Sequence, residues 1–245
     1  MALTPTLEDL SRIPLDQTAL FLDVDGTLID IAPTPGEVVV SDELKALLPR
    51  LHQRTGGALA LVSGRAIADL DALFAPVKLP MAGQHGAEWR LAADGTHESV
   101  AGLPEPLRTS AVALALRHPG MLVEDKGGAI ALHVRARPEL TDEIAAALAQ
   151  MVQAHPDYEV LHGKAVFEIR RRGVHKGAAV AMLLEKAPFA GRTPVFVGDD
   201  TTDLDAIALV RERGGLGLFV GPDGPLRQPH DVRAWLARLA EQDGG

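Results

Sequence analysis

The chain has 245 residues, enough for one large domain or for a core with a smaller second domain. Hydrophobic residues make up 47% and charged residues 23%, as in a globular protein with a sizeable buried core. The formal net charge of -9 argues against a general nucleic-acid or anionic-membrane binder, because both functions need a broad basic surface. The chain has no cysteine, which excludes disulfides, zinc–thiolate sites and thiol nucleophiles.

No apolar run approaches the length of a membrane span, and residues 1–10 lack a basic region followed by an apolar segment. The sequence therefore predicts a soluble protein that is located in the cytoplasm and does not bind membranes. It leaves the oligomeric state open, and a monomer is compatible with it.

Several short apolar runs end in a polar residue or a glycine, which is typical of buried strands. The strands predicted in this way cover residues 18–22, 58–62, 194–197 and 216–220. Helical patterns follow at residues 66–74 and 203–213. Buried strands that alternate with helices predict an α/β fold with a doubly wound parallel sheet covered on both faces. In such sheets ligands bind beyond the carboxyl ends of the strands.

The middle of the chain has two similar halves, each with a helical pattern, a strand, a glycine turn and a second strand. The helical patterns cover residues 106–117 and 138–154, and the strands cover residues 121–126, 129–135, 158–162 and 164–170. This pseudo-repeat predicts an α+β insert in which two hairpins form one antiparallel sheet with both helices on one face. Residues 105–171 would form the insert, and residues 1–104 and 172–245 would form one core around it.

Two aspartates one residue apart, Asp23 and Asp25, directly follow the first predicted strand. Because residues two apart in a strand point to the same face, both carboxylates can be aimed at one spot, and Gly26 allows a sharp turn beside them. Such a pair suits a hard cation, and one member could attack phosphorus or carbon. An Asp-rich turn that binds its own backbone explains this stretch alone equally well.

Two further residues at element ends are candidates for binding phosphate. Ser63, followed by Gly64 and Arg65, precedes a predicted helix, so its hydroxyl would either cap that helix or hold a phosphate there. Lys176 lies in the first turn of a predicted helix over residues 176–186, where a cation opposes the helix dipole by about 0.3–1 kcal/mol. An anion bound beside Lys176 would reverse that sign, which favours a functional role.

A second group of acids follows the third predicted strand, at Asp199, Asp200, Asp203 and Asp205. Acids at a helix start offset the helix dipole, but this number exceeds what capping needs. Together with the acid pair at Asp23 they would complete an oxygen-rich site for Mg²⁺.

The insert carries polar side chains on the two strands of its first hairpin. Alternation places Glu124 and Lys126 on one face of their strand, and His133 and Arg135 on one face of the partner strand. They are either the solvated face of a half-exposed sheet or groups that bind a polyhydroxyl ligand. His85 lies between glycines at residues 83 and 86, which indicates a tight approach near the sheet edge.

Four motifs occur in a specific order at strand and helix ends: DVDGT at Asp23, SGR at Ser63, HKG at Lys176 and GDDTTD at Asp199. In these motifs the chain resembles the haloacid-dehalogenase (HAD) superfamily of phosphatases over its whole length. This resemblance implies a Rossmann-like core and makes the insert a cap domain that determines substrate specificity.

The insert narrows the resemblance to the trehalose-6-phosphate phosphatases. The residues that carry it are EDK at Glu124, HVR at Arg135, the turn GQHG, the strand with Glu168, and GDDTTD. Leu204 stands where that family usually has glutamate, and Arg171 stands where proline is frequent. The resemblance implies Mg²⁺-dependent hydrolysis of trehalose 6-phosphate, a small sugar phosphate, to trehalose and phosphate.

The resemblance also implies roles for the motif residues. Asp23 would attack phosphorus and form an aspartyl-phosphate, and Asp25 would protonate the leaving sugar oxygen and then deprotonate water. Ser63 and Lys176 would hold the phosphoryl oxygens. The residues expected to bind the rest of the substrate are Gly64, Arg65, His85, Glu124, Lys126, His133, Arg135 and Glu168.

The same resemblance implies a metal site at the two acidic motifs. Mg²⁺ would bind the Asp23 carboxylate, the backbone carbonyl of Asp25 and Asp199. Asp200 is a further candidate for this site, where it would act, like Asp203, by orienting the ligands from outside.

Other functions remain open on the sequence alone. The nearest alternative is a phosphatase for another sugar phosphate, such as sucrose 6-phosphate or mannosyl-3-phosphoglycerate, or a sugar phosphomutase. A non-catalytic sugar-phosphate sensor is a third possibility, but such a protein would tolerate the loss of Asp23 or Asp25, and both are present.

Overall fold

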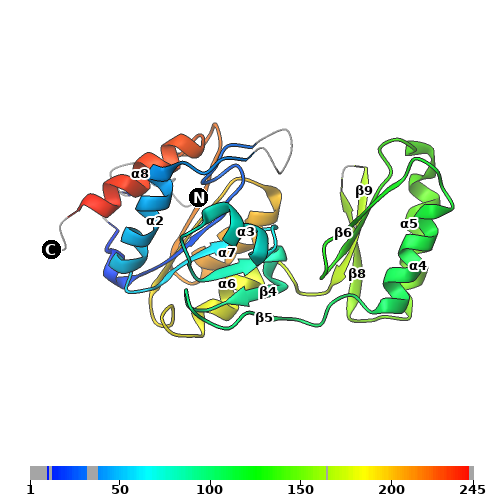
Figure 1. Cartoon of the computed structure of the whole chain (residues 1–245), viewed down its shortest axis with the longest axis horizontal. Helices are drawn as coiled ribbons and strands as arrows, with labels where there is room; N and C mark the ends of the chain where they lie inside the picture. Colours follow the sequence, from blue (N-terminus) through cyan, green and yellow to red (C-terminus); the bar gives the residue numbers. More distant parts are fainter. Residues whose placement is uncertain (1–9, 11–12, 32–37, 164, 243–245) are drawn as a thin grey trace. The chain divides into compact units, whose positions relative to one another are not determined.

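The structure is a computed structural model that describes residues 10, 13–31, 38–163 and 165–242. The chain forms two compact units, drawn in Figure 1. The core unit combines Met1–Glu98 with His175–Gly245, and the cap unit is Ser99–Val174. The sequence predicts an insert over residues 105–171, so the cap unit begins six residues earlier and ends three residues later than predicted.

None of the helices in the described part of the chain is both long and apolar enough to cross a membrane. Residues 1–10, whose sequence predicts no targeting signal, lie outside the described residues except for Leu10.

The core unit is built on a seven-stranded sheet in the order β11-β10-β1-β2-β3-β4-β5. The strands from β11 to β3 are parallel, and β4 pairs with β3 in the antiparallel sense. Strand β1 therefore lies between β10 and β2, which come from distant parts of the chain. The strands are β1 (Thr18–Leu22), β2 (Leu59–Val62), β3 (Met81–Gly83), β4 (Glu88–Arg90), β5 (Glu98–Ser99), β10 (Thr193–Gly198) and β11 (Leu216–Phe219).

Helices cover both faces of this sheet because its central strands are apolar on both sides. Leu20 and Leu22 of β1 belong to one buried cluster with α2, α3 and α8, whereas Ala19 and Phe21 belong to a second cluster with α6 and α7. The predicted doubly wound α/β core is confirmed. The helices are α2 (Asp42–Arg54), α3 (Ile67–Phe74), α6 (Lys176–Leu184), α7 (Leu204–Glu212) and α8 (Pro229–Glu241).

The cap unit is a four-stranded antiparallel sheet in the order β6-β7-β9-β8, with α4 and α5 packed on one face (Figure 1). Ile130, Leu132, Phe167 and Ile169 form a buried layer with these helices. This confirms the predicted pair of hairpins, although residue 164 of the predicted last strand lies outside the described residues. The elements are α4 (Glu105–Leu116), β6 (Leu122–Asp125), β7 (Ile130–His133), α5 (Thr141–Gln153), β8 (Tyr158–Gly163) and β9 (Val166–Arg171).

Short 3-10 turns precede two of the predicted helices. The helix predicted from residue 203 starts at Leu204, after a turn at Thr201–Asp203, and the helix predicted from residue 138 starts at Thr141, after a turn at Pro138–Leu140. Among the described residues, Leu15–Gln17 and Gln84–Gly86 also form 3-10 turns.

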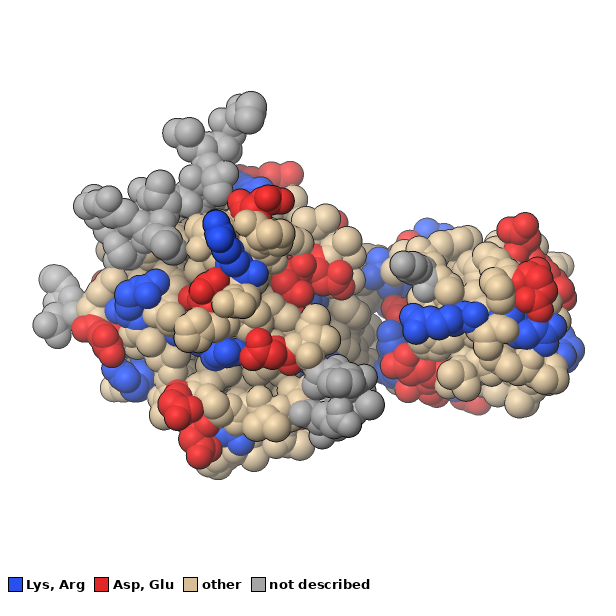
Figure 2. All heavy atoms as spheres, turned by 90° about the horizontal axis from the view of Figure 1, so that it is seen from above, with Lys and Arg blue, Asp and Glu red and all other residues tan. Residues whose placement is uncertain are grey.

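Basic and acidic side chains are mixed over the face of both units shown in Figure 2. In the cap unit, for example, Arg108 pairs with Asp125 and Arg170 pairs with Glu159. Acidic residues outnumber basic ones in the sequence, which gives the net charge of -9, but on this face the acidic side chains of the described residues lie among basic ones.

Candidate active site

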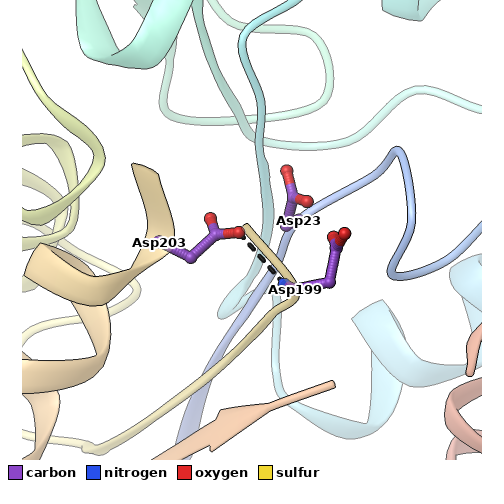
Figure 3. Close-up of side chains that lie close together, drawn as sticks. All are labelled: Asp23, Asp199 and Asp203. Atoms are coloured by element: carbon purple, nitrogen blue, oxygen red, sulfur yellow. Dashed lines mark hydrogen bonds between the residues drawn. The ribbon is translucent and has the colours of Figure 1, made fainter. Parts of the chain in front are cut away.

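Three strands of the core unit end at one edge of the sheet, and a predicted site residue follows each of them. Asp23 follows β1, Ser63 follows β2 and Asp199 follows β10. Because β1 is parallel to both neighbours, the carboxyl ends of these strands meet. In Figure 3 the carboxylates of Asp23 and Asp199 point into the same space, and Asp203 approaches them from the turn after β10.

These three acids form a cluster that could hold a metal ion. One carboxylate oxygen from each of Asp23, Asp199 and Asp203 lies within 4.8 Å of the others. Asp23 and Asp203 are buried, at 4% and 0% exposed, and Asp199 is half-buried. Burial of this much negative charge requires compensation nearby.

Lys176 supplies part of that compensation. It is the first residue of α6 and is 3% exposed, and its Nζ donates to Oδ1 of Asp23 at 2.7 Å and to Oδ1 of Asp203 at 2.6 Å. Burial alone would lower the pKa of Lys176, but the two carboxylates outweigh it and raise that pKa above its ordinary value. A lysine at a helix start, unfavourable for the helix dipole, is thus explained by two buried partners.

Asp203 is fully occupied by contacts within the protein. Its Oδ2 accepts the backbone N–H groups of Asp199, at 3.1 Å, and Asp200, at 3.0 Å, while its Oδ1 accepts from Lys176. This geometry suits a residue that orients the site rather than one that binds a metal directly.

Asp200 does not join the cluster among the described residues. Its exposed carboxylate accepts from the backbone N–H of Thr201 at 2.7 Å and from the hydroxyl of the same residue at 3.2 Å. Asp200 and Asp203 form a capping box at this turn, so helix-start capping accounts for the side chain of Asp200.

The remaining acids carry more negative charge than Lys176 balances. Burial raises the pKa of Asp23 to about 7, and the charge of Asp203 adds to this while Lys176 opposes it. Burial also raises the pKa of Asp199, against a hydrogen bond from Thr27. Among the described residues, the carboxylates of Asp23, Asp199 and Asp203 thus carry more negative charge than Lys176 offsets, and their hard oxygen donors fit Mg²⁺.

Gly26 and Thr27 hold Asp199 close to Asp23. The hydroxyl of Thr27 donates to Oδ1 of Asp199 at 2.8 Å and lies 3.3 Å from Oδ2 of Asp23. Gly26 has φ +81°, and a Cβ there would lie 2.1 Å from Oδ2 of Asp199. Only glycine permits this approach.

Asp25 is held by Arg65 rather than by the acid cluster. Nε and Nη2 of Arg65 each donate to one carboxylate oxygen of Asp25, both at 2.7 Å. The predicted proton carrier is thus bound in a bidentate pair by a residue that the sequence assigned to the substrate.

Ser63 and its neighbours form the predicted phosphate loop beside this pair. Ser63 is 1% exposed, and its Oγ accepts the backbone N–H of Arg65 at 3.2 Å. The backbone of His85 has a positive φ of +58°. A Cβ on Gly64 would lie 2.7 Å from Nε2 of His85. The imidazole of His85 therefore lies directly against the loop.

The predicted sugar-binding residues of the cap unit pair with one another. Nε2 of His133 lies 3.1 Å from Oε2 of Glu124, and Nζ of Lys126 donates to Oε2 of Glu168 at 2.7 Å. Ala131 of β7 is paired with Glu124 of β6 on one side and with Glu168 of β9 on the other, so both acids lie on the face of the cap sheet without helices. Arg135 is exposed just after β7.

Sequence reasoning did not assign two residues that contact this site. Thr27 belongs to the quoted motif DVDGT, and its spacing of four residues from Asp23 could have indicated it. Glu88 accepts a hydrogen bond from the backbone of Ile67 at 2.6 Å, and nothing in its local sequence indicates this contact.

Comparison with known proteins places this geometry in a family. The family model described as trehalose-phosphatase matches residues 21–221. The chain is 43% identical over 213 residues to a probable trehalose-phosphate phosphatase of Sinorhizobium fredii, which covers 86% of this chain and 80% of that protein. It is 41% identical over 230 residues to the trehalose-6-phosphate phosphatase of Escherichia coli, which covers 90% of this chain and 86% of that protein.

A solved structure agrees with these matches. The trehalose-6-phosphate phosphatase of Aspergillus fumigatus superposes with a TM-score of 0.74 at 25% identity, and the match covers 97% of this chain and 98% of the other. The family model alone spans most of the sequence, from within β1 to two residues beyond β11. The chain therefore belongs to the trehalose-phosphatase family, within the haloacid-dehalogenase superfamily.

Proposed function

We propose that this protein is a Mg²⁺-dependent phosphatase that hydrolyses trehalose 6-phosphate to trehalose and phosphate. The observation that carries the proposal is the buried pair of Asp23 and Lys176 beside Asp199, at the carboxyl edge of the sheet in a member of this family. The named relatives that share 41% and 43% of their aligned residues with this chain support the substrate.

The reaction proceeds in two displacements at phosphorus. In the first, a carboxylate oxygen of Asp23 attacks phosphorus, the bond from phosphorus to the sugar oxygen breaks, and Asp25 gives that oxygen a proton. In the second, water attacks phosphorus, Asp25 takes a proton from the water, and the bond to Asp23 breaks to release phosphate. When Asp25 carries a proton on one oxygen, its other oxygen continues to accept from Arg65.

Lys176 and Ser63 hold the phosphoryl oxygens during both steps. An ammonium group has three N–H donors, and Lys176 uses two of them on Asp23 and Asp203. The third is left for a phosphoryl oxygen. The hydroxyl oxygen of Ser63 accepts from Arg65, so its own hydrogen is directed elsewhere and can reach a second phosphoryl oxygen.

Residues at the two acidic strand ends would hold the metal ion. Asp23, Asp199 and the backbone carbonyl of Asp25 would hold Mg²⁺, with Asp203 fixing the loop from outside. When bound, the cation reduces repulsion between the carboxylate nucleophile and the anionic phosphate. A cytoplasmic location stays a prediction.

Phosphate release from a panel of sugar phosphates, with Mg²⁺ and with a chelator, tests the proposal. Trehalose 6-phosphate is expected to give the highest kcat/KM, and the chelator is expected to abolish activity until Mg²⁺ is restored. Sucrose 6-phosphate, mannosyl-3-phosphoglycerate and a small aryl phosphate complete the panel. A better rate on another sugar phosphate would overturn the substrate, and transfer of phosphate to a second sugar hydroxyl would identify a phosphomutase.

A cap variant tests where substrate specificity resides. Glu124→Ala should reduce kcat/KM for trehalose 6-phosphate by roughly 10²-fold and leave hydrolysis of a small aryl phosphate nearly unchanged, because only the disaccharide offers hydroxyl groups to this face. Glu143→Ala serves as the matched control, since Glu143 is an exposed residue of α5, on the other side of the cap sheet. Equal losses on both substrates would argue against sugar recognition by Glu124.

A further inference from the structure

The loop that carries Ser63 and Arg65 runs directly into α3, and this helix lacks a cap of its own. Its N-cap residue is Ala66, which makes no side-chain cap hydrogen bond. The first backbone N–H groups of a helix have no partner inside it. Ile67, the first residue of α3, is 3% exposed, so water is not a ready substitute.

Glu88 supplies the missing acceptor from another strand. Its Oε1 accepts the backbone N–H of Ile67 at 2.6 Å, across 21 residues of sequence. Its Oε2 lies 2.8 Å from Nε2 of His97, and the residue is 8% exposed. Both oxygens of this buried carboxylate are therefore held, and its charge lies at the favourable end of the helix dipole.

Glu88 is packed tightly against the loop as well as bonded to it. A Cβ on Gly83 would lie 2.7 Å from Oε1 of Glu88 and 2.9 Å from both the carbonyl oxygen of Arg65 and the nitrogen of Ile67. The segment from residue 83 to residue 88 thus passes the loop without space for a side chain at Gly83. The carboxylate of Glu88 therefore cannot move without a matching shift of the backbone around Arg65 and Ile67.

Backbone bonds from the same segment hold the other residues of the loop. The N–H of Gln84 donates to the carbonyl of Arg65 at 2.9 Å, and the N–H of His85 donates to the carbonyl of Ser63 at 2.9 Å. Beyond the loop, the guanidinium of Arg65 carries both bonds to Asp25. Glu88 is therefore connected to the predicted proton carrier through its hydrogen bond to Ile67, the backbone from Ile67 back to Arg65, and the bonds from Arg65 to Asp25.

We propose that Glu88 is a positioning residue for phosphoryl transfer. By capping α3 from outside, it fixes the loop so that the Ser63 hydroxyl faces the phosphoryl group and Arg65 holds Asp25. This inference rests on the proposed phosphatase function, but it concerns the phosphoryl end of the substrate and is independent of which sugar is bound.

Three variants separate the hydrogen bond from the charge and from simple stability. Glu88→Ala is expected to lower kcat by roughly 10²-fold on trehalose 6-phosphate and on a small aryl phosphate alike, because a shift of about 1 Å in a positioning group has this cost. Glu88→Gln keeps an oxygen acceptor for Ile67 and should stay within about threefold of the wild type. His97→Ala, which leaves that bond in place, should do the same.

The assays are run well below the unfolding midpoint of each variant, which is measured in parallel. Full activity in folded Glu88→Ala, or a change in its midpoint alone, would overturn the inference. Equal losses in the glutamine and alanine variants would show that the charge matters instead of the acceptor, and would also overturn it.

Hydrogen exchange at the Ile67 amide gives a readout that does not depend on activity. The exchange rate should rise at least tenfold in Glu88→Ala and remain unchanged in Glu88→Gln, since only the alanine variant removes the acceptor. A wild-type protein that hydrolyses no phosphoester would defeat the proposed function, and the role of Glu88 in holding the loop would still be decided by this exchange rate. Unchanged exchange in Glu88→Ala would refute that role.

Discussion

Replacing Asp23 with asparagine is expected to abolish phosphate release, with a loss in kcat of roughly 10³-fold or more. An amide is a poor nucleophile toward phosphorus, and the substitution also removes one anionic oxygen from the proposed metal site. Phosphate release from trehalose 6-phosphate in saturating Mg²⁺ is the measurement. Asp16→Asn is the matched control, since Asp16 is an exposed residue of the core unit.

The same variant should fold at least as stably as the wild type. Burial raises the pKa of Asp23 to about 7, which means that the ionised carboxylate is unfavourable where it lies. Asparagine has nearly the same shape and carries no charge, so the thermal midpoint is expected to stay the same or rise. Retained activity would remove Asp23 as the nucleophile, and a large fall in the midpoint would contradict this account of its environment.

Lys176→Met is expected to damage both stability and activity. The change leaves Asp23 and Asp203 buried without their shared cation, and breaking a buried ion pair in this way costs about 3–5 kcal/mol. Urea unfolding in the absence of Mg²⁺ measures the free energy of unfolding. Lys186→Met, at an exposed lysine of the same unit, should change that free energy by only a few tenths of a kcal/mol.

A second substitution tests whether the effect arises from uncompensated charge. Adding Asp203→Asn to Lys176→Met removes one of the two stranded carboxylates, so the double variant should lose less stability than the sum of the two single losses. Additive losses would mean that Lys176 stabilises the core unit through packing of its alkyl chain alone.

The sequence predicted the parts of the site that depend on strand ends. Asp23, Ser63 and Asp199 each follow an apolar run, and parallel strands bring such ends together whatever the details of packing. The alternation of Glu124 and Lys126 likewise placed both on one face of the cap sheet. The spacing of apolar residues and the polar residues or glycines that end an apolar run are local properties, so a single sequence shows them.

Side-chain pairing across elements was not visible in this way. Arg65 was assigned to the substrate, yet it binds Asp25, because the direction of a long side chain depends on packing around the loop. Glu88 contacts Ile67 through β4, a strand that was not predicted at all. Short antiparallel edge strands such as β4 (Glu88–Arg90) carry too few residues for a periodic pattern.

The sequence analysis also missed the helices α2 and α8, although the apolar residues of both recur at a regular spacing. The buried residues of α2 include Leu44, Leu47, Leu48 and Leu51, which recur at the helical period. This helix contains Pro49, which usually ends a helix, and such a residue weakens the pattern when the sequence is read alone.

The position of β1 between β2 and β10 has a consequence for synthesis on the ribosome. Lys176 follows Asp23 by 153 residues, so at about 5–20 residues per second a nascent chain spends roughly 8–30 s with this carboxylate but without its counter-charge. Throughout that interval one edge of β1 lacks its partner β10, and the whole cap unit is synthesised within it. The acid cluster at the carboxyl edge of the sheet is therefore incomplete until β10 and the acids that follow it, up to Asp203, have been synthesised.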